Sequence, residues 1–146
     1  MVKKRVHLKV LAIDPGDRRI GVAVSDPTGT IARALTTLRH VSRALDAASL
    51  ADLAREEGVE RIVVGKAGED DQPQAQKAVR MVEALRGQTD LPIELWDESF
   101  TTVDAHATML ASGKKRRARR EQIDAVAAAI LLQSYLDAHP PESSSN

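Results

Sequence analysis

The fold of this chain is decided by the stretch Leu11-Ala12-Ile13-Asp14-Pro15-Gly16-Asp17-Arg18-Arg19-Ile20-Gly21-Val22-Ala23-Val24-Ser25-Asp26. It holds an apolar run that ends at Ile13 and a second run from Ile20 to Ser25, separated by a short polar link. Apolar runs rich in Val and Ile are typical of buried strands, and a short link between two of them favours an antiparallel hairpin. Alternating apolar residues from Val6 onward extend the first strand toward the N-terminus. We therefore expect two paired strands, the first of which ends at Asp14.

The pattern after this hairpin predicts one mixed sheet with helices. A third strand is expected over residues 31–38, and a helix is expected to begin at its N-cap Ser42 and to stop at Gly58. The remaining expected elements are, in chain order, a strand over 61–65, a helix opening at Pro73, a strand over 91–96, a helix from the capping box Thr101-x-x-Asp104 to Gly113, and a helix over 119–137. This order predicts an α/β fold, a mixed five-stranded sheet with three antiparallel strands followed by parallel strands, and helices on both faces.

Length and composition are those of one globular domain. The chain has 146 residues, and we assign the domain to residues 1–138 and a disordered tail to residues 139–146. Hydrophobic residues make up 42% and charged residues 29%, a balance typical of globular proteins. The longest apolar run, from Ala125 to Leu132, has eight residues, whereas a membrane-spanning helix needs about 20. The absence of cysteine excludes disulfides and thiolate metal sites. These features predict a cytoplasmic protein without membrane contact.

Positive and negative charges cancel over the whole sequence but are unevenly distributed along it. The net charge is +5 over residues 1–40, −7 over 41–110 and +2 over 111–146. A dense basic run lies in the last segment, and next to an acidic site it favours contact with a nucleic-acid backbone over a merely solvated loop. Arg19, close to Asp14 in the hairpin, either reaches the same substrate or pairs with a carboxylate. The predicted nucleic-acid-binding residues are Arg19, Lys114, Lys115, Arg116, Arg117, Arg119 and Arg120.

Carboxylates follow two of the predicted strands and lie early in the last predicted helix. Asp14 ends the first strand, whereas Asp97 and Glu98 follow a later one. Asp124 lies beside the apolar stripe of the last helix. Carboxylates on separate elements can hold Mg²⁺ or Mn²⁺ beside a phosphate, where two ions roughly 4 Å apart assist phosphodiester hydrolysis. The structural alternative is a turn at Asp14, a solvated loop at residues 97–98 and a helix-dipole contact at Asp124.

Several motifs of the chain resemble, in the same order, those of the YqgF/RuvX family of Holliday-junction-resolvase-like proteins, which have an RNase H-like fold. The resemblance covers about residues 6–137. It rests on the stretch quoted above and on Ile62-Val63-Val64-Gly65, Pro73-Gln74-Ala75-Gln76, Leu95-Trp96-Asp97-Glu98, Thr101-Thr102, Gly113 with the basic run, and the run from Asp124 to Leu136. The segment 66–72 and Ser99 depart from the family pattern.

The resemblance implies a small bacterial nuclease that depends on Mg²⁺ or Mn²⁺, with Asp14, Glu98 and Asp124 as its catalytic and metal-binding acids. It also implies RNA as the substrate, in maturation of the 5′ end of the 16S ribosomal RNA precursor, free or within a ribosomal particle. Two alternatives remain open. One is a resolvase of branched DNA, which would need a dimer to cut related strands symmetrically. The other is a non-catalytic RNA- or ribosome-binding module on the same scaffold. Sequence does not decide between a monomer and a homodimer.

Overall fold

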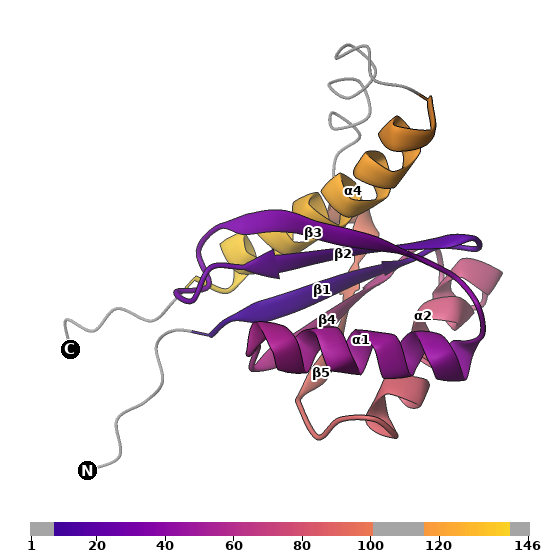
Figure 1. The fold of residues 1–146 in the computed structure, drawn as a ribbon, viewed down its shortest axis with the longest axis horizontal. Helices are drawn as coiled ribbons and strands as arrows, with labels where there is room; N and C mark the ends of the chain where they lie inside the picture. Colours follow the sequence, from indigo (N-terminus) through magenta and orange to yellow (C-terminus); the bar gives the residue numbers. More distant parts are fainter. Residues whose placement is uncertain (1–7, 101–115, 141–146) are drawn as a thin grey trace.

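A computed structural model describes residues 8–100 and 116–140 of the chain (Figure 1). Its centre is a five-stranded sheet in the order β3-β2-β1-β4-β5. The strands are β1 (Val10–Pro15), β2 (Arg19–Ser25), β3 (Ala32–Arg39), β4 (Arg61–Lys66) and β5 (Ile93–Asp97). Strand β2 is antiparallel to both β1 and β3, whereas β4 is parallel to both β1 and β5. The predicted mixed sheet of antiparallel and then parallel strands is confirmed.

Helices cover both faces of the sheet (Figure 1). α1 (Arg43–Glu57) and α2 (Pro73–Arg86) pack on one face, and α4 (Arg116–Ala138) crosses the other. α1 begins where predicted, because the Ser42 hydroxyl accepts a hydrogen bond from the Leu45 N–H at 3.2 Å. It ends at Gly58, whose φ of 67° favours a residue without a Cβ. No helix in the described part of the chain is long and apolar enough to cross a membrane.

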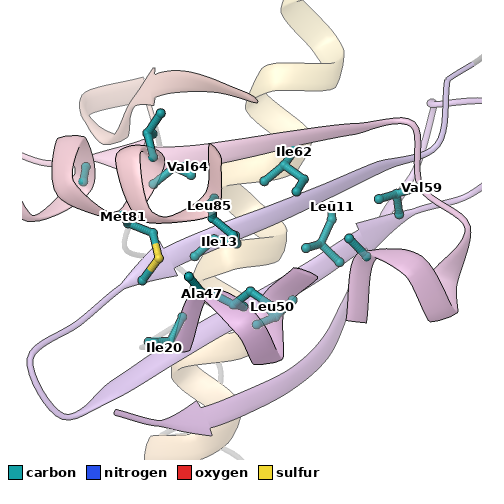
Figure 2. Close-up of a cluster of buried hydrophobic side chains, with 14 of the residues drawn as sticks. Leu11, Ile13, Ile20, Ala47, Leu50, Val59, Ile62, Val64, Met81 and Leu85 are labelled. Atoms are coloured by element: carbon teal, nitrogen blue, oxygen red, sulfur yellow. The ribbon is translucent and has the colours of Figure 1, made fainter. Parts of the chain in front are cut away.

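Alternating strand residues divide the hydrophobic core into two layers. Leu11 and Ile13 of β1 belong to the layer beneath α1 and α2, which Figure 2 shows. Val10 and Ala12 belong to the layer beneath α4. Successive side chains of a strand point to opposite faces, so Asp14 continues the row that faces α4. The first predicted acid therefore lies on the face that the last helix crosses.

The starts of three elements differ by two residues or more from the sequence predictions. β1 begins at Val10 rather than Val6, because residues 8–9 lie ahead of the strand and residues 1–7 lie outside the described part. β5 begins after Pro92, which has no N–H to donate to a neighbouring strand. α4 begins at Arg116 rather than Arg119, because arginine is a strong helix former and the basic run continues the helix. The predicted helix over 101–113 and residues 141–146 of the predicted tail lie outside the described residues.

The turn between β2 and β3 is organised by the carboxylate of Asp26. It accepts hydrogen bonds from the Ile31 N–H at 3.0 Å, the Thr28 hydroxyl at 2.5 Å and the Thr30 N–H at 2.8 Å. The Ile31 and Thr28 bonds are the main causes that lower the pKa of Asp26 from 3.8 to about 2. Because the folded pKa lies below the unfolded one, this stabilisation is present above pH 3.8 and is lost as the pH falls toward about 2.

The Asp26→Asn substitution is expected to lower the free energy of unfolding by about 1 kcal/mol at neutral pH, because a neutral amide accepts these solvent-exposed bonds less strongly. The difference from the original chain should shrink as the pH falls from 3.8 toward about 2. Urea denaturation at a series of pH values measures both effects. Asp52→Asn, on the exposed face of α1, is the matched control and should change stability by a few tenths of a kcal/mol at most. A difference that stays constant across this pH range would contradict the role of the carboxylate charge.

Candidate active site

Asp14 and Glu98 meet on the side of the sheet that faces α4. Asp14 lies next to the last residue of β1, and Glu98 opens the 3₁₀ helix η1 (Glu98–Phe100) directly after β5. β4 lies between these two strands, yet a hydrogen bond joins the two carboxyl groups. Both strands are parallel to β4, so their carboxyl ends lie at the same edge of the sheet. The structure thus brings together two of the three acids predicted from the sequence.

A glycine in β4 makes this contact possible. A Cβ built on Gly65 would lie 3.0 Å from Glu98 Cγ and 2.8 Å from Leu131 Cδ2. Both distances are shorter than the separation of about 3.5–4.0 Å that two carbon atoms prefer. The Glu98 side chain therefore occupies the space that a larger residue at position 65 would fill. Sequence reasoning missed this role, although a glycine inside a strand is itself a sign of close approach.

The two carboxyl groups influence each other's ionisation. Burial raises the pKa of Glu98 above its ordinary value of 4.5, the hydrogen bond with Asp14 opposes that rise, and the charge of Asp97 adds to it. Two carboxylates in contact repel each other when both are ionised, unless a proton or a cation lies between them. We therefore expect Glu98 to hold a proton more readily than an exposed glutamate does.

Asp97 and Glu98 are neighbours in the sequence but have different surroundings. Trp96 packs in the layer beneath α4, so the alternation along β5 turns Asp97 toward the opposite face. Asp97 accepts a hydrogen bond from the Ser99 N–H at 2.8 Å, and this bond, the Ser99 hydroxyl and the charge of Lys66 lower its pKa. The sequence left both acids as candidates, and it is Glu98 that the structure turns toward the first acid.

The third predicted acid, Asp124, lies on α4 beside this pair. Its backbone oxygen rests on β2, because a Cβ built on Gly21 would be 2.0 Å from that oxygen. Gly21 is in turn the register partner of Asp14. The Asp124 carboxylate, however, accepts a hydrogen bond from Arg19 Nε at 2.5 Å. Within residues 8–100 and 116–140 there is accordingly no group of three or more acidic or histidine side chains that could hold a metal ion.

The predicted basic residues fall partly on α4 and partly outside the described residues. The last helix was predicted to begin at Arg119, with the earlier part of the basic run ahead of it. Because α4 begins at Arg116, four of these residues instead form its first turns. Asp124 then lies more than two turns inside the helix, too far from the N-terminus for the helix-dipole contact considered from the sequence. Helical spacing assigns positions 117 and 120 to the same side of α4 as Asp124. The four on the helix are Arg116, Arg117, Arg119 and Arg120, and the two outside the described residues are Lys114 and Lys115.

Aromatic packing fixes the end of β5 against α4. Trp96 Nε1 donates a hydrogen bond to the Ser134 hydroxyl at 2.7 Å, and its ring meets the ring of Tyr135 edge to face at 5.3 Å. The Tyr135 hydroxyl donates to Glu94 at 2.6 Å and accepts from Arg61 at 2.9 Å. Trp96 is thus a packing residue. It holds in place the strand end from which Glu98 projects.

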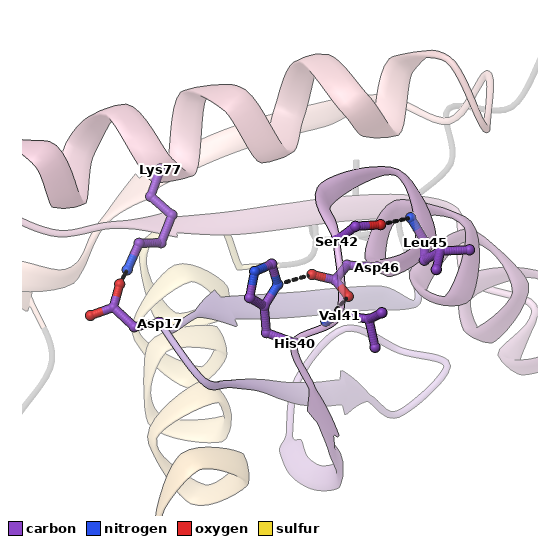
Figure 3. Close-up of polar contacts among 7 residues, drawn as sticks. All are labelled: Asp17, His40, Val41, Ser42, Leu45, Asp46 and Lys77. Atoms are coloured by element: carbon purple, nitrogen blue, oxygen red, sulfur yellow. Dashed lines mark hydrogen bonds and ion pairs between the residues drawn. The ribbon is translucent and has the colours of Figure 1, made fainter.

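A second polar cluster, which the sequence analysis did not single out, lies on the opposite face of the sheet (Figure 3). Asp46, 5% exposed, contacts His40 Nδ1 and accepts a hydrogen bond from the Val41 N–H at 3.0 Å. Lys77 of α2 forms an ion pair with Asp17 in the link between β1 and β2. These contacts tie the beginning of α1 and the hairpin to the rest of the domain, so they support the strand that carries the first acid.

Comparison with solved structures identifies the class of fold. RuvC from Thermus thermophilus, in complex with a Holliday junction substrate, matches 93% of this chain and 99% of its own with a TM-score of 0.61 and 16% identity. The fowlpox virus resolvase, also with Holliday junction DNA, matches 91% of this chain and 99% of its own with a TM-score of 0.56 and 11% identity. The protein therefore has an RNase H-like fold, as the sequence resemblance implied.

Comparison of sequences identifies the family within that class. The profile described as "RuvX: Holliday junction resolvase" matches residues 8–138, and the chain belongs to this family. A protein from Clostridium novyi is 39% identical over 137 residues, covering 89% of this chain and 98% of its own. A protein from Moorella thermoacetica is 41% identical over 133 residues, covering 89% of this chain and 95% of its own. Both relatives bear the name "Putative pre-16S rRNA nuclease". The family resemblance read from the motifs is confirmed.

Proposed function

We propose that this protein is a divalent-metal-dependent nuclease that hydrolyses RNA and takes part in maturing the 5′ end of the 16S ribosomal RNA precursor. The observation that carries the proposal is the contact between Asp14 and Glu98 on the face crossed by α4. The names of the Clostridium and Moorella relatives support precursor RNA as the substrate. Membership of a resolvase family supports hydrolysis of phosphodiester bonds.

The acid pair fits a hard divalent cation. Its donor atoms are carboxylate oxygens, the ligands that Mg²⁺ and Mn²⁺ prefer. Burial raises the pKa of Glu98, and a bound cation would favour its ionised form. Asp14 and Glu98 would hold the ion, and Asp124 would join them on leaving Arg19. When bound, such an ion activates water and stabilises the charge that develops on the phosphate.

Basic residues of α4 bind and orient the RNA in this proposal. Positions 117 and 120 carry arginines on the side of α4 that also bears Asp124, and positive charge there attracts the phosphate backbone toward the acids. Asp14 lies on a central strand of the sheet, which gives the site a rigid base. Residues 1–138 form one nuclease domain in this proposal. It acts in the cytoplasm, on precursor RNA either free or within a ribosomal particle.

The test compares two labelled substrates, a 16S precursor fragment with an extended 5′ end and a four-way DNA junction, with Mg²⁺, Mn²⁺ or a chelator. We expect cleavage of the RNA that needs the metal and is abolished by Asp14→Asn. Asp52→Asn, on the exposed face of α1, is the matched control and should retain activity. Cleavage of the junction without cleavage of the RNA would instead favour the resolvase. Binding of RNA that is unchanged by Asp14→Asn, with no cleavage by either protein, would favour a non-catalytic module.

A further inference from the structure

The third acid of the site forms an ion pair with a basic side chain. Arg19 of β2 donates a hydrogen bond from Nε to Asp124 Oδ2 of α4 at 2.5 Å. The two residues are 105 positions apart in the chain, and their side chains are 35% and 30% exposed. The contact is therefore a tertiary ion pair at the rim of the site, shielded from solvent on most of its surface. Such a charge-assisted hydrogen bond is among the stronger polar contacts.

The backbone around this ion pair is fixed, whereas its side chains are long enough to move. Gly21 seats the Asp124 backbone on β2, at the register partner of Asp14. A rotation of the Asp124 side chain can therefore redirect its carboxylate without moving the helix. Asp14 lies one strand away from Gly21, on the same face of the sheet, and Glu98 contacts Asp14 there. Arg19 thus holds the Asp124 carboxylate, and within the described residues the three acids form no group that could hold a metal ion.

We propose that Arg19 is a latch: it pairs with Asp124 while the acid site holds no cation, and it transfers to a phosphate of the RNA when a divalent cation claims Asp124. The proposal rests on the nuclease function proposed above and adds a coupling between its two ligands. A cation and Arg19 compete for one carboxylate, so binding of the cation frees a guanidinium at the rim of the site. Binding of metal and binding of RNA then favour each other, and linkage requires that the effect be reciprocal.

A neighbouring arginine offers a matched control. Arg39 of β3 is the register partner of Arg19, and residues directly opposite each other on antiparallel strands project from the same face. Arg39 is exposed and has no ion pair within the described residues. It therefore carries the same charge at nearly the same position without contacting Asp124. Removal of Arg39 takes away one positive charge near the site. Removal of Arg19 takes away the same charge and also frees the Asp124 carboxylate.

The first experiment titrates Mn²⁺ into the full chain and measures binding by calorimetry, with no RNA present. The latch predicts that Arg19→Gln binds Mn²⁺ about three- to tenfold more tightly than the original protein, because the cation no longer has to break an ion pair. Arg39→Gln should change Mn²⁺ affinity by less than about twofold. An equal increase in Mn²⁺ affinity in both variants would overturn the latch, because it would show a general effect of removing positive charge. An unchanged or weaker affinity in Arg19→Gln would also overturn it.

The second experiment measures RNA affinity with a chelator and with Ca²⁺, in reactions where gel analysis confirms that the RNA stays intact. Without metal, Arg19→Gln should bind RNA as the original protein does, because Arg19 is occupied by Asp124. With Ca²⁺, the original protein should bind about fivefold more tightly than Arg19→Gln and show about one more phosphate contact in its salt dependence. Arg39→Gln should weaken RNA binding by the same factor with and without Ca²⁺.

The outcomes separate the latch from the function on which it rests. Absence of Mn²⁺ binding in both the original protein and Arg19→Gln would overturn the metal site and the latch together. Mn²⁺ binding with equal affinity in both, accompanied by metal-dependent RNA cleavage, would overturn the latch and leave the proposed nuclease intact. A loss of RNA affinity in Arg19→Gln of the same size with and without Ca²⁺ would show that Arg19 contacts RNA at all times, which also overturns the latch.

Discussion

Cleavage of the precursor RNA by the Glu98→Gln protein is expected to be about 10³-fold slower than by the original chain, because the amide removes one charged oxygen donor from the proposed metal site. The measurement is the initial rate of cleavage with saturating Mn²⁺. Asp97→Asn is the matched control, since Asp97 precedes Glu98 directly but is turned toward the other face of the sheet. We expect Asp97→Asn to keep its rate within about threefold of the original. Similar losses of cleavage rate in both variants would contradict the assignment of Glu98, rather than Asp97, to the metal site.

Glu98→Gln is expected to lower the cleavage rate without lowering stability. Glu98 has a raised pKa in the folded protein, so the folded state binds a proton more tightly than the unfolded state does. The original protein should therefore gain stability as the pH falls through this raised value toward 4.5, and it should lack that gain at neutral pH. In a chelator, Glu98→Gln should be at least as stable as the original protein at neutral pH. Metal-dependent cleavage should decline over the same pH range, because the cation competes with the proton.

Replacement of Gly21 by Ala is expected to lower the free energy of unfolding by about 3 kcal/mol. The added Cβ would lie 2.0 Å from the Asp124 oxygen and 2.6 Å from its carbonyl carbon, and both are backbone atoms of α4. A flexible side chain cannot relieve this clash, so the helix itself must shift. The shift would carry Asp124 away from the acid pair, and cleavage of RNA should fall together with stability. Urea denaturation and the cleavage assay measure the two effects.

Gly87→Ala is the control for this prediction. Gly87 has a φ of −81° and its added Cβ would be 3.5 Å from the Ala84 oxygen, an ordinary contact. This change should alter stability by no more than about 0.5 kcal/mol. If Gly21→Ala lowered stability as little as Gly87→Ala, the close contact between the α4 backbone and Gly21 of β2 would be contradicted.

Much of the fold could be predicted because its signals are local. The Val- and Ile-rich runs on either side of the first polar link identified two strands, and Ser42 and Gly58 marked both ends of α1. The prediction for the last helix was less accurate, because a run of arginines is compatible with a solvated loop and with a helix. Local sequence pattern therefore did not show that the helix begins as early as Arg116.

The candidate site could be predicted only in part. The sequence placed Asp14 and the pair Asp97 and Glu98 after predicted strands, and because the carboxyl ends of parallel strands lie at one edge of a sheet, these acids come together in the structure. The choice of Glu98 over Asp97 came from the family resemblance, and in the structure it follows from the side of β5 on which each residue lies. The partner of Arg19 stayed open in the sequence as either a substrate phosphate or a carboxylate. In the structure it is Asp124.

By itself, the sequence determined the order of strands and helices and the residues able to carry the chemistry, since hydrophobic periodicity and residue type act over a few neighbouring positions. The tertiary structure decided which of those residues meet. Gly65 and Gly21 have no side chain, and only the packing of Glu98 over one and α4 over the other gives them a role. Contacts between residues far apart in the chain depend on how the sheet and α4 pack. Local sequence pattern carries no information about which of these residues come together.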